Sequence, residues 1–282
     1  MTSNTKIHAI PTGNFKLDGG AMFGVVPKNI WQKLILPDEN NLCNWAMRCV
    51  LVETADRRIL IDTGIGNKQN EKFYSYYHLN GDNSLEKSIG RVGFGFEDIT
   101  DVLLTHLHFD HCGGAVFRND NLALVPRFPN ALYHVTSQHW EHANHPNERE
   151  KASFLPENFE PLMKAGKINF VKDGDTIADC IDIKVFNGHT FGMIVPLIHS
   201  NDQKYMFMAD LIPSSAHVSI NYVMGYDIQP LITMAEKKAL LPWLEKNGVF
   251  LIYEHDLQCL GSRVEGNEKG QFKAVDFFNT LS

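Results

Sequence analysis

The chain has 282 residues, 44% of them hydrophobic and 21% charged, which is an ordinary composition for a globular protein with a sizeable core. Its formal net charge of −7 disfavours a nucleic-acid partner, because proteins that bind a phosphate backbone usually present a basic face. No stretch approaches the roughly 18 apolar residues of a membrane span, the first residues lack a signal-peptide pattern, and the five cysteines form no CxxC pair. We therefore expect a soluble, cytoplasmic protein.

Short apolar runs rich in β-branched and aromatic residues predict buried strands. In chain order these runs are 46–53, 58–62, 101–105, 181–186, 205–209 and 249–253. Helical spacing or composition marks the segments 84–92, 137–143, 159–165 and 233–246, and Pro242 should kink the last of them. The pattern indicates a mixed α/β protein. Because no repeat or linker marks a boundary, we expect a single domain over 1–282.

Two segments, 18–38 and 68–83, match neither pattern. The first is rich in glycine and large apolar residues, and the second is rich in tyrosine, asparagine and phenylalanine. Long irregular loops in a compact domain are often lids or binding loops. Segment 18–38 suits either a substrate groove or a homodimer contact.

The stretch THLHFDHCGG at 105–114 crowds three histidines and one aspartate into six positions. His106 and His108 are two apart, so their imidazoles project to the same side of an extended strand end. Asp110 and His111 follow at the turn that the two glycines permit, where they can address a second point nearby. Imidazole and carboxylate groups suit Zn²⁺, with Fe, Mn or Co as alternatives, so the stretch predicts a metal site.

Further ligands must come from other parts of the chain, because this stretch alone cannot fill the coordination of two metals. His189, Asp210 and His255 each follow an apolar run, which places them where strands end. Singly, each would more often be a structural residue. Together with the first stretch they complete a set of ligands.

These motifs resemble those of the metallo-β-lactamase superfamily. The residues that carry the resemblance are HLHFDH at 106–111, DTG at 62–64, GHT at 188–190, Asp210 and His255. The resemblance implies an α/β fold, a four-layer αββα sandwich with a dinuclear metal site at one edge of the sheets. It implies hydrolysis as the reaction, because two metals lower the pKa of a water molecule and polarise the substrate.

The resemblance also assigns a role to each ligand. The first metal would be held by His106, His108 and His189, the second by Asp110, His111 and His255, and Asp210 would bridge both. Asp62 would orient a ligand imidazole, although a turn residue before Gly64 is the alternative. Mononuclear iron relatives that oxidise persulfides lack the second set, whereas this chain keeps both.

Within the superfamily, the sequence is most similar to the bacterial lactonases that open N-acyl homoserine lactones, in particular the YtnP-like group. The similarity rests on HLHFDHxGG, on LDGGAMFGVVPKNIW and on MADLIPSSAH. It implies that a metal-bridging hydroxide attacks the lactone carbonyl and that Asp110 delivers a proton to the leaving alkoxide. Met22, Phe23 and Trp31 would then either line an apolar groove for an acyl chain or pack in the core.

The chain departs from the lactonase pattern after Asp210. Several lactonases place a tyrosine about three residues after the bridging aspartate to assist the substrate carbonyl, and this chain has none there. His217, Tyr222 and Tyr226 are the candidate replacements. Phe191 also replaces the proline that is common after GHT.

Other histidines and a cysteine have plainer interpretations. Cys112 follows a ligand directly, and passive packing is the favoured interpretation. The cluster His139, His142 and His145 predicts an exposed helical face, since no second ligand pair is evident nearby.

The rival hypotheses for the activity share the same ligands. A phosphotriesterase or arylesterase would use the same nucleophile, and a β-lactamase or a thioester hydrolase of glyoxalase II type would lack the N-terminal DGGAMFG segment. A catalytically silent ligand-binding protein would be expected to have lost ligands, and none is missing. All of these hypotheses imply a small-molecule partner.

Overall fold

The computed structural model describes residues 5–281 and contains two stacked mixed sheets. The first sheet has the order β1 (Lys6–Asp18), β2 (Leu42–Glu53), β3 (Arg58–Ile61), β4 (Asp101–Leu103), β7 (Leu132–Thr136) and β8 (Ile168–Val171). The second has the order β17 (Phe272–Phe278), β16 (Gly261–Gly266), β15 (Phe250–Ile252), β14 (Gln203–Phe207), β13 (Leu197–Ser200), β10 (Ile181–Asp182) and β9 (Thr176–Ile177).

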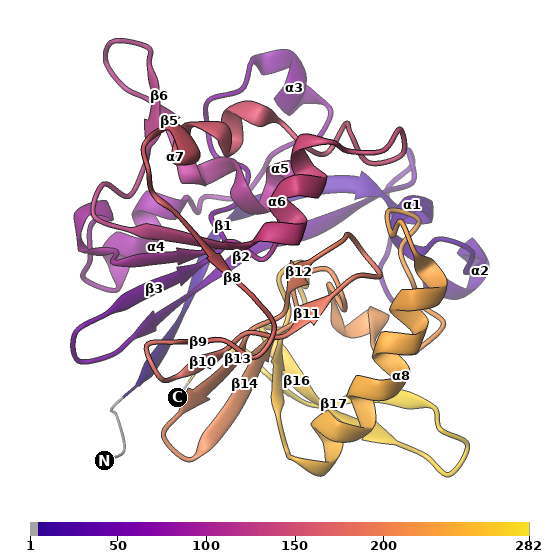
Figure 1. Cartoon of the computed structure of the whole chain (residues 1–282). Coiled ribbons are helices and arrows are strands. Elements are labelled where there is room, and N and C mark those ends of the chain that lie inside the picture. Colours follow the sequence, from indigo (N-terminus) through magenta and orange to yellow (C-terminus); the bar gives the residue numbers. More distant parts are fainter. Residues whose placement is uncertain (1–4, 282) are drawn as a thin grey trace.

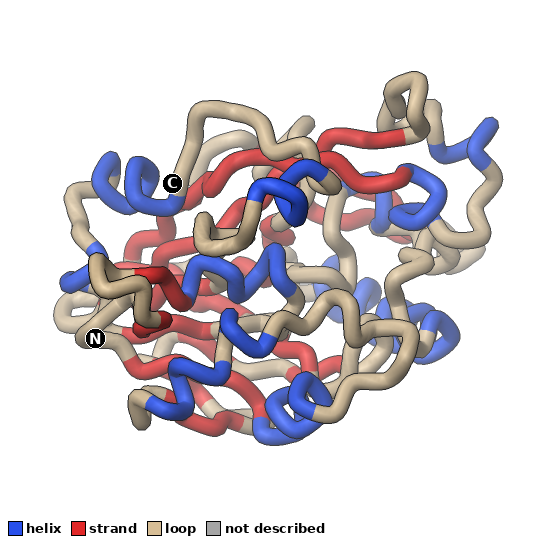
Figure 2. Tube along the Cα trace, turned by 90° about the horizontal axis from the view of Figure 1, so that it is seen from above, coloured by secondary structure: helices blue, strands red, loops and turns tan. Residues whose placement is uncertain are grey.

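Helices and two small hairpins surround the sheets (Figure 1, Figure 2). The hairpins are β5 (Val116–Arg118) with β6 (Leu124–Pro126), and β11 (Val185–Phe186) with β12 (Met193–Ile194). The helices are α1 (Gly19–Phe23), α2 (Lys28–Trp31), α3 (Glu71–Ser75), α4 (Leu85–Arg91), α5 (Phe109–Cys112), α6 (Ser137–Asn144), α7 (Glu160–Lys164) and α8 (Pro230–Lys246). Among the described residues, no helix is long and apolar enough to cross a bilayer.

The alternation of side chains along β2 explains the layers. Val50 and Val52 lie in the cluster between the two sheets, whereas Cys49 and Leu51 lie in the cluster beneath the outer helices. Both faces of this strand are therefore buried, as its almost uninterrupted apolar sequence requires. The predicted αββα sandwich is confirmed: α4, α6 and α7 cover the first sheet and α8 covers the second (Figure 1).

Several predicted elements differ from those observed. The run 181–186 is two short strands in different sheets rather than one. The irregular segments 18–38 and 68–83 contain α1, α2 and α3. Helix α8 starts three residues before its predicted first residue and is continuous through Pro242.

Candidate metal centre

The loop after β4 carries the first four candidate ligands at one end of the first sheet. Its two glycines let it dock against the loop after β3, because a Cβ atom on Gly113 would lie 2.1 Å from the Ile65 oxygen and one on Gly114 would lie 2.2 Å from the Thr63 oxygen. The docked loops are joined by the hydrogen bond from Thr63 N to His111 O, at 2.8 Å. The two glycines at the end of HLHFDHCGG thus allow the ligand loop to pack directly against the DTG loop.

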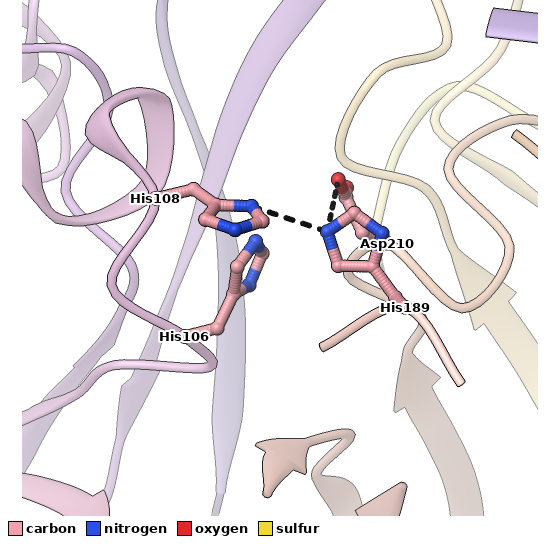
Figure 3. A group of neighbouring side chains, drawn as sticks. All are labelled: His106, His108, His189 and Asp210. Carbon is pink, nitrogen blue, oxygen red and sulfur yellow. Dashed lines mark hydrogen bonds and ion pairs between the residues drawn. The ribbon is translucent and has the colours of Figure 1, made fainter. Parts of the chain in front are cut away.

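The structure brings all seven predicted ligands together in two adjoining groups. The first group is His106, His108, His189 and Asp210, and the second is Asp110, His111 and His255. Figure 3 shows the first group, in which the two histidines of the β4 loop face His189 and Asp210 from the other half of the chain. The atoms His108 Nδ1 and His189 Nε2 lie 3.2 Å apart, as do His189 Nε2 and Asp210 Oδ2.

Asp210 lies between the two groups and offers one oxygen to each. Its Oδ2 atom faces His189, while its Oδ1 atom lies 3.1 Å from His255 Nε2 and 3.5 Å from His111 Nε2. Burial raises the pKa of this carboxyl group, but the three histidines outweigh burial and lower the pKa well below its usual value. The ionised carboxylate is the form that could bridge two cations.

The ring nitrogens of the ligand histidines that point away from the centre are all held by protein groups. The pairs are His106 Nδ1 with Thr105 Oγ1, His108 Nε2 with Glu150, His189 Nδ1 with Asp227, His111 Nδ1 with Asp62 and Glu254, and His255 Nδ1 with Ala46 O. Such partners fix the tautomer, so the remaining nitrogens are free to act as ligands.

Two atoms at the centre test whether a metal fits. His106 Nε2 is buried and has no hydrogen-bond partner, and Asp210 Oδ1 is buried and makes no contact of hydrogen-bond geometry, although it lies close to His255. Buried polar atoms are normally paired, because leaving one unpaired costs free energy. The donor set of five imidazoles and two carboxylates therefore fits two divalent cations, one in each group.

Asp62 lies behind the ligands, where the sequence predicts it. Its carboxylate accepts hydrogen bonds from Thr105 N (2.8 Å) and Thr105 Oγ1 (2.6 Å), and it lies 3.3 Å from His111 Nδ1. The Thr105 hydroxyl lies in turn 3.0 Å from His106 Nδ1. One carboxylate thus supports a histidine of each group.

Sequence reasoning missed the supporting groups Glu150, Asp227 and Glu254. Glu150 and Asp227 lie in irregular loops, 42 and 38 positions from the histidines they bind. No local spacing marks them, so only the fold reveals the contacts. Glu254 directly precedes a ligand, and its Oε2 atom lies 3.0 Å from His111 Nδ1.

The predicted exposed face of three histidines on α6 is wrong for His139. This side chain is fully buried, and only His145 is exposed. His142 is partly buried and its Nε2 atom lies 2.6 Å from Glu150 Oε2. His139 and His142 therefore support the metal centre, whereas His145 faces solvent as predicted.

A cavity of about 360 Å³ opens over the two groups of ligands. Its floor includes Asp110, Asp210 and His255. Its walls include the largely apolar side chains Leu17, Met22, Tyr77, Phe109, Met224 and Tyr226, together with Arg149, Glu150 and Ser153. Met22 therefore lies where the groove was predicted. Phe23 and Trp31 do not: they are buried and stack on each other at 5.2 Å, which is the packing alternative.

The three candidate replacements for the lactonase tyrosine lie in different places. His217 is buried against Phe23, and its two ring nitrogens are taken by Ser214 Oγ (2.7 Å) and Met22 O (2.9 Å), so it has no free donor for a substrate. That correction removes it as a candidate. Tyr222 packs edge-on against Phe23 and does not line the cavity, whereas Tyr226 does.

A comparison with known families and proteins agrees with this geometry. The model of the metallo-beta-lactamase superfamily matches residues 48–249. A solved probable metal-dependent hydrolase from Staphylococcus aureus is 28% identical, with a TM-score of 0.89 over 99% of this chain and 98% of its own. The solved structure of AidC, a dizinc quorum-quenching lactonase in complex with a product, is 23% identical, with a TM-score of 0.79 over 98% of this chain and 95% of its own.

Curated sequence relatives are similar over a shorter stretch. The N-acyl homoserine lactonase AiiA of Bacillus thuringiensis subsp. kurstaki is 29% identical over 161 residues, which is 54% of this chain and 56% of that protein. The N-acyl homoserine lactonase AttM of Rhizobium radiobacter is 24% identical over 183 residues, which is 63% of this chain and 66% of that protein. The chain spans about half the length of the first of these curated relatives.

Proposed function

Since this chain belongs to the metallo-beta-lactamase superfamily, we propose that it is a dinuclear metal-dependent lactonase that opens N-acyl homoserine lactones or related lactones. The proposal rests on the complete set of ligands together with the shape of the cavity above them. Relatives with this activity, such as AiiA and AttM, support the choice of substrate class. Zinc is the proposed metal, because three imidazoles in one group and a mixed donor set in the other suit it.

The observation that carries the proposal is the contrast between the floor and the walls of the cavity. The floor presents ligand carboxylates and imidazoles, where an ester carbonyl would react. The walls present Leu17, Met22 and Met224, which suit an apolar acyl chain. Methionine side chains adapt to chains of different length, so we expect a broad acyl-chain range.

When bound, two divalent ions would lower the pKa of a water molecule and polarise the substrate carbonyl. Tyr226 is the residue of the chain that we propose to assist the carbonyl oxygen. Burial and the nearby Asp110 raise the pKa of its phenol, so the hydroxyl stays protonated and able to donate. Asp110 borders the cavity and would carry a proton to the leaving oxygen.

A substrate panel on purified protein with measured metal content tests the proposal. We expect kcat/KM for N-acyl homoserine lactones to exceed that for aryl esters, for paraoxon-type phosphotriesters and for β-lactams. The expected advantage persists when the acyl chain is lengthened or shortened. A wide preference for phosphotriesters or aryl esters would replace the lactonase proposal with the corresponding esterase.

A further inference from the structure

Two buried carboxylates hold the histidines that face each other in the first group of ligands. Glu150 Oε1 lies 2.9 Å from His108 Nε2, and Asp227 Oδ1 lies 2.9 Å from His189 Nδ1. Both carboxylates are almost fully buried, with 3% and 1% of their surface exposed. Each histidine therefore depends on one carboxylate for its orientation.

The two carboxylates are anchored in different layers of the sandwich. The other oxygen of Glu150 lies 2.6 Å from His142 Nε2 on α6, outside the first sheet. The other oxygen of Asp227 accepts a hydrogen bond of 2.6 Å from Thr233 Oγ1 on α8, outside the second sheet. Figure 1 shows these helices in separate parts of the molecule. The first group is thus assembled from histidines whose carboxylate partners are held by different layers.

Arg149 connects the two layers directly. It precedes Glu150 in the chain, and its Nη2 atom donates to the main-chain oxygens of Gly225 and Asp227, the latter at 3.3 Å. A continuous path of contacts therefore runs from His108 through Glu150 and Arg149 to Asp227 and His189. The gap that remains in this path is the 3.2 Å between the two ligand nitrogens.

We propose that Arg149 is a positioning residue that sets the separation of His108 and His189 and thereby the affinity of the first metal. Arg149 acts through the main chain: its own backbone adjoins Glu150, and its side chain holds the backbone oxygens of Gly225 and Asp227. It is not itself one of the ligands. Because Tyr226 lies between its two acceptors, Arg149 also fixes the wall of the cavity at that point.

The chemistry of the side chain suits this role. Two neighbouring carbonyl oxygens need a donor with several N–H groups in fixed directions, and a planar guanidinium offers them. A lysine ammonium can also bind several main-chain oxygens, as Lys237 does with those of His217, Ser219 and Tyr222. It lacks the planar guanidinium that fixes the directions of the donors, so we expect it to hold the two oxygens less rigidly. The two acceptors lie 76 and 78 positions after Arg149 in the chain. The contact therefore joins two distant segments, whose relative position is not determined by local structure.

The test compares Arg149→Met and Arg149→Lys with the control Arg118→Met. Arg118 also donates to a main-chain oxygen, that of Leu122 at 3.3 Å, but within its own hairpin. Titration of the full-length metal-free protein with ¹¹³Cd²⁺, followed by NMR, resolves the two sites because one has more imidazole donors than the other. Chelator competition then gives the affinity of each site.

We expect Arg149→Met to weaken the first site by up to about 10-fold, the lower end of the effect of removing a group that contacts a ligand directly, because Arg149 acts one contact further out. The second site should keep its affinity, Arg149→Lys should restore part of the loss, and Arg118→Met should behave as the unmodified protein. Equal affinities in Arg149→Met and the unmodified protein would overturn the proposal. So would an equal loss at both sites together with a lower melting temperature of the metal-free protein, since that pattern indicates a general loss of stability.

The proposal concerns the metal centre and not the substrate. A panel without lactonase activity would leave the expected cadmium affinities unchanged, so the two proposals fail on different measurements.

Discussion

His139 Nε2 accepts a hydrogen bond of 2.8 Å from the main-chain N–H of Leu107, the residue between two candidate metal ligands. The other ring nitrogen of His139 donates to Phe191 O, at 2.7 Å, in the loop that carries His189. One neutral imidazole thus ties together the two loops of the first group. Burial lowers the pKa of His139 to about 3, which keeps the ring in this neutral form.

Replacing His139 by leucine should lower the free energy of unfolding and the metal content. The change leaves Leu107 N–H and Phe191 O buried without partners, at a cost of about 1–3 kcal/mol for each. Urea unfolding and metal analysis measure the two effects. His145→Leu at the C-cap of the same helix is the control, because His145 is exposed. Equal stability and metal content in the two variants would contradict the linking role.

Glu150→Gln should weaken the first metal site by about 10- to 100-fold. Burial raises the pKa of Glu150, but hydrogen bonds from His108 and His142 outweigh it and lower the pKa to about 2, so the group is a carboxylate that accepts from both rings. An amide can accept from only one of them. Chelator competition measures the affinity, and Glu148→Gln, two residues before Glu150 and on the surface, is the control. Unaltered affinity in Glu150→Gln would show that His108 needs no carboxylate.

Tyr226→Phe should reduce kcat by about 100-fold or more, the usual loss when a donor to a developing oxyanion is removed. The metal content should stay unchanged, because the phenol lies in the cavity wall and not among the ligands. Tyr222→Phe is the matched control, since Tyr222 lies outside the cavity. If both variants keep full kcat, the carbonyl is assisted by another group.

Local sequence patterns were sufficient to predict the mixed α/β class and the candidate ligands, whereas the αββα layers followed from the resemblance to the family. Short apolar runs locate most central strands, and the ligands stand directly after such runs. Strand β1 was missed because Pro11 and Gly13 interrupt its pattern. The structure accommodates them with a register shift between Pro11 and Asn14, where Gly13 has a φ of 120°.

The groups around the ligands could not be predicted, because they depend on contacts between distant segments. Glu150 and Asp227 look like ordinary loop residues until α6 and α8 bring them to their histidines. Phe23 and Trp31 show a similar limit, since large apolar residues suit a groove and a core equally well. Only the stacking of the two rings in the interior decides between these roles.

His217 should make the protein less stable in acid. Burial lowers the pKa of His217 to about 4 from 6.5, so between these values the unfolded chain binds a proton that the folded chain does not. The free energy of unfolding therefore falls as the pH is lowered through this window, by up to about 1.4 kcal/mol per pH unit. The glutamine in His217→Gln does not bind this proton, so the free energy of unfolding of the variant should fall less over the same pH window.

Urea unfolding of both proteins at several pH values, with a chelator to remove metal effects, measures the difference. The stability advantage of the unmodified protein over His217→Gln should shrink from pH 6 to pH 4. A constant difference across this window would show that His217 is protonated equally in the folded and unfolded chains.

Asp210→Asn should remove metal from both groups and abolish most of the turnover. The amide carries no negative charge. It also replaces one of the two oxygens that face His189, His111 and His255 with an NH₂ group, which cannot coordinate a cation. Metal analysis and kcat/KM on the same preparation separate the loss of metal from a loss of rate. Asp173→Asn is the control, because Asp173 is exposed and accepts only from Val185 N among the described contacts. Two bound metals per chain with normal turnover in Asp210→Asn would contradict the bridging role, whereas the loss of only one metal would assign Asp210 to a single site.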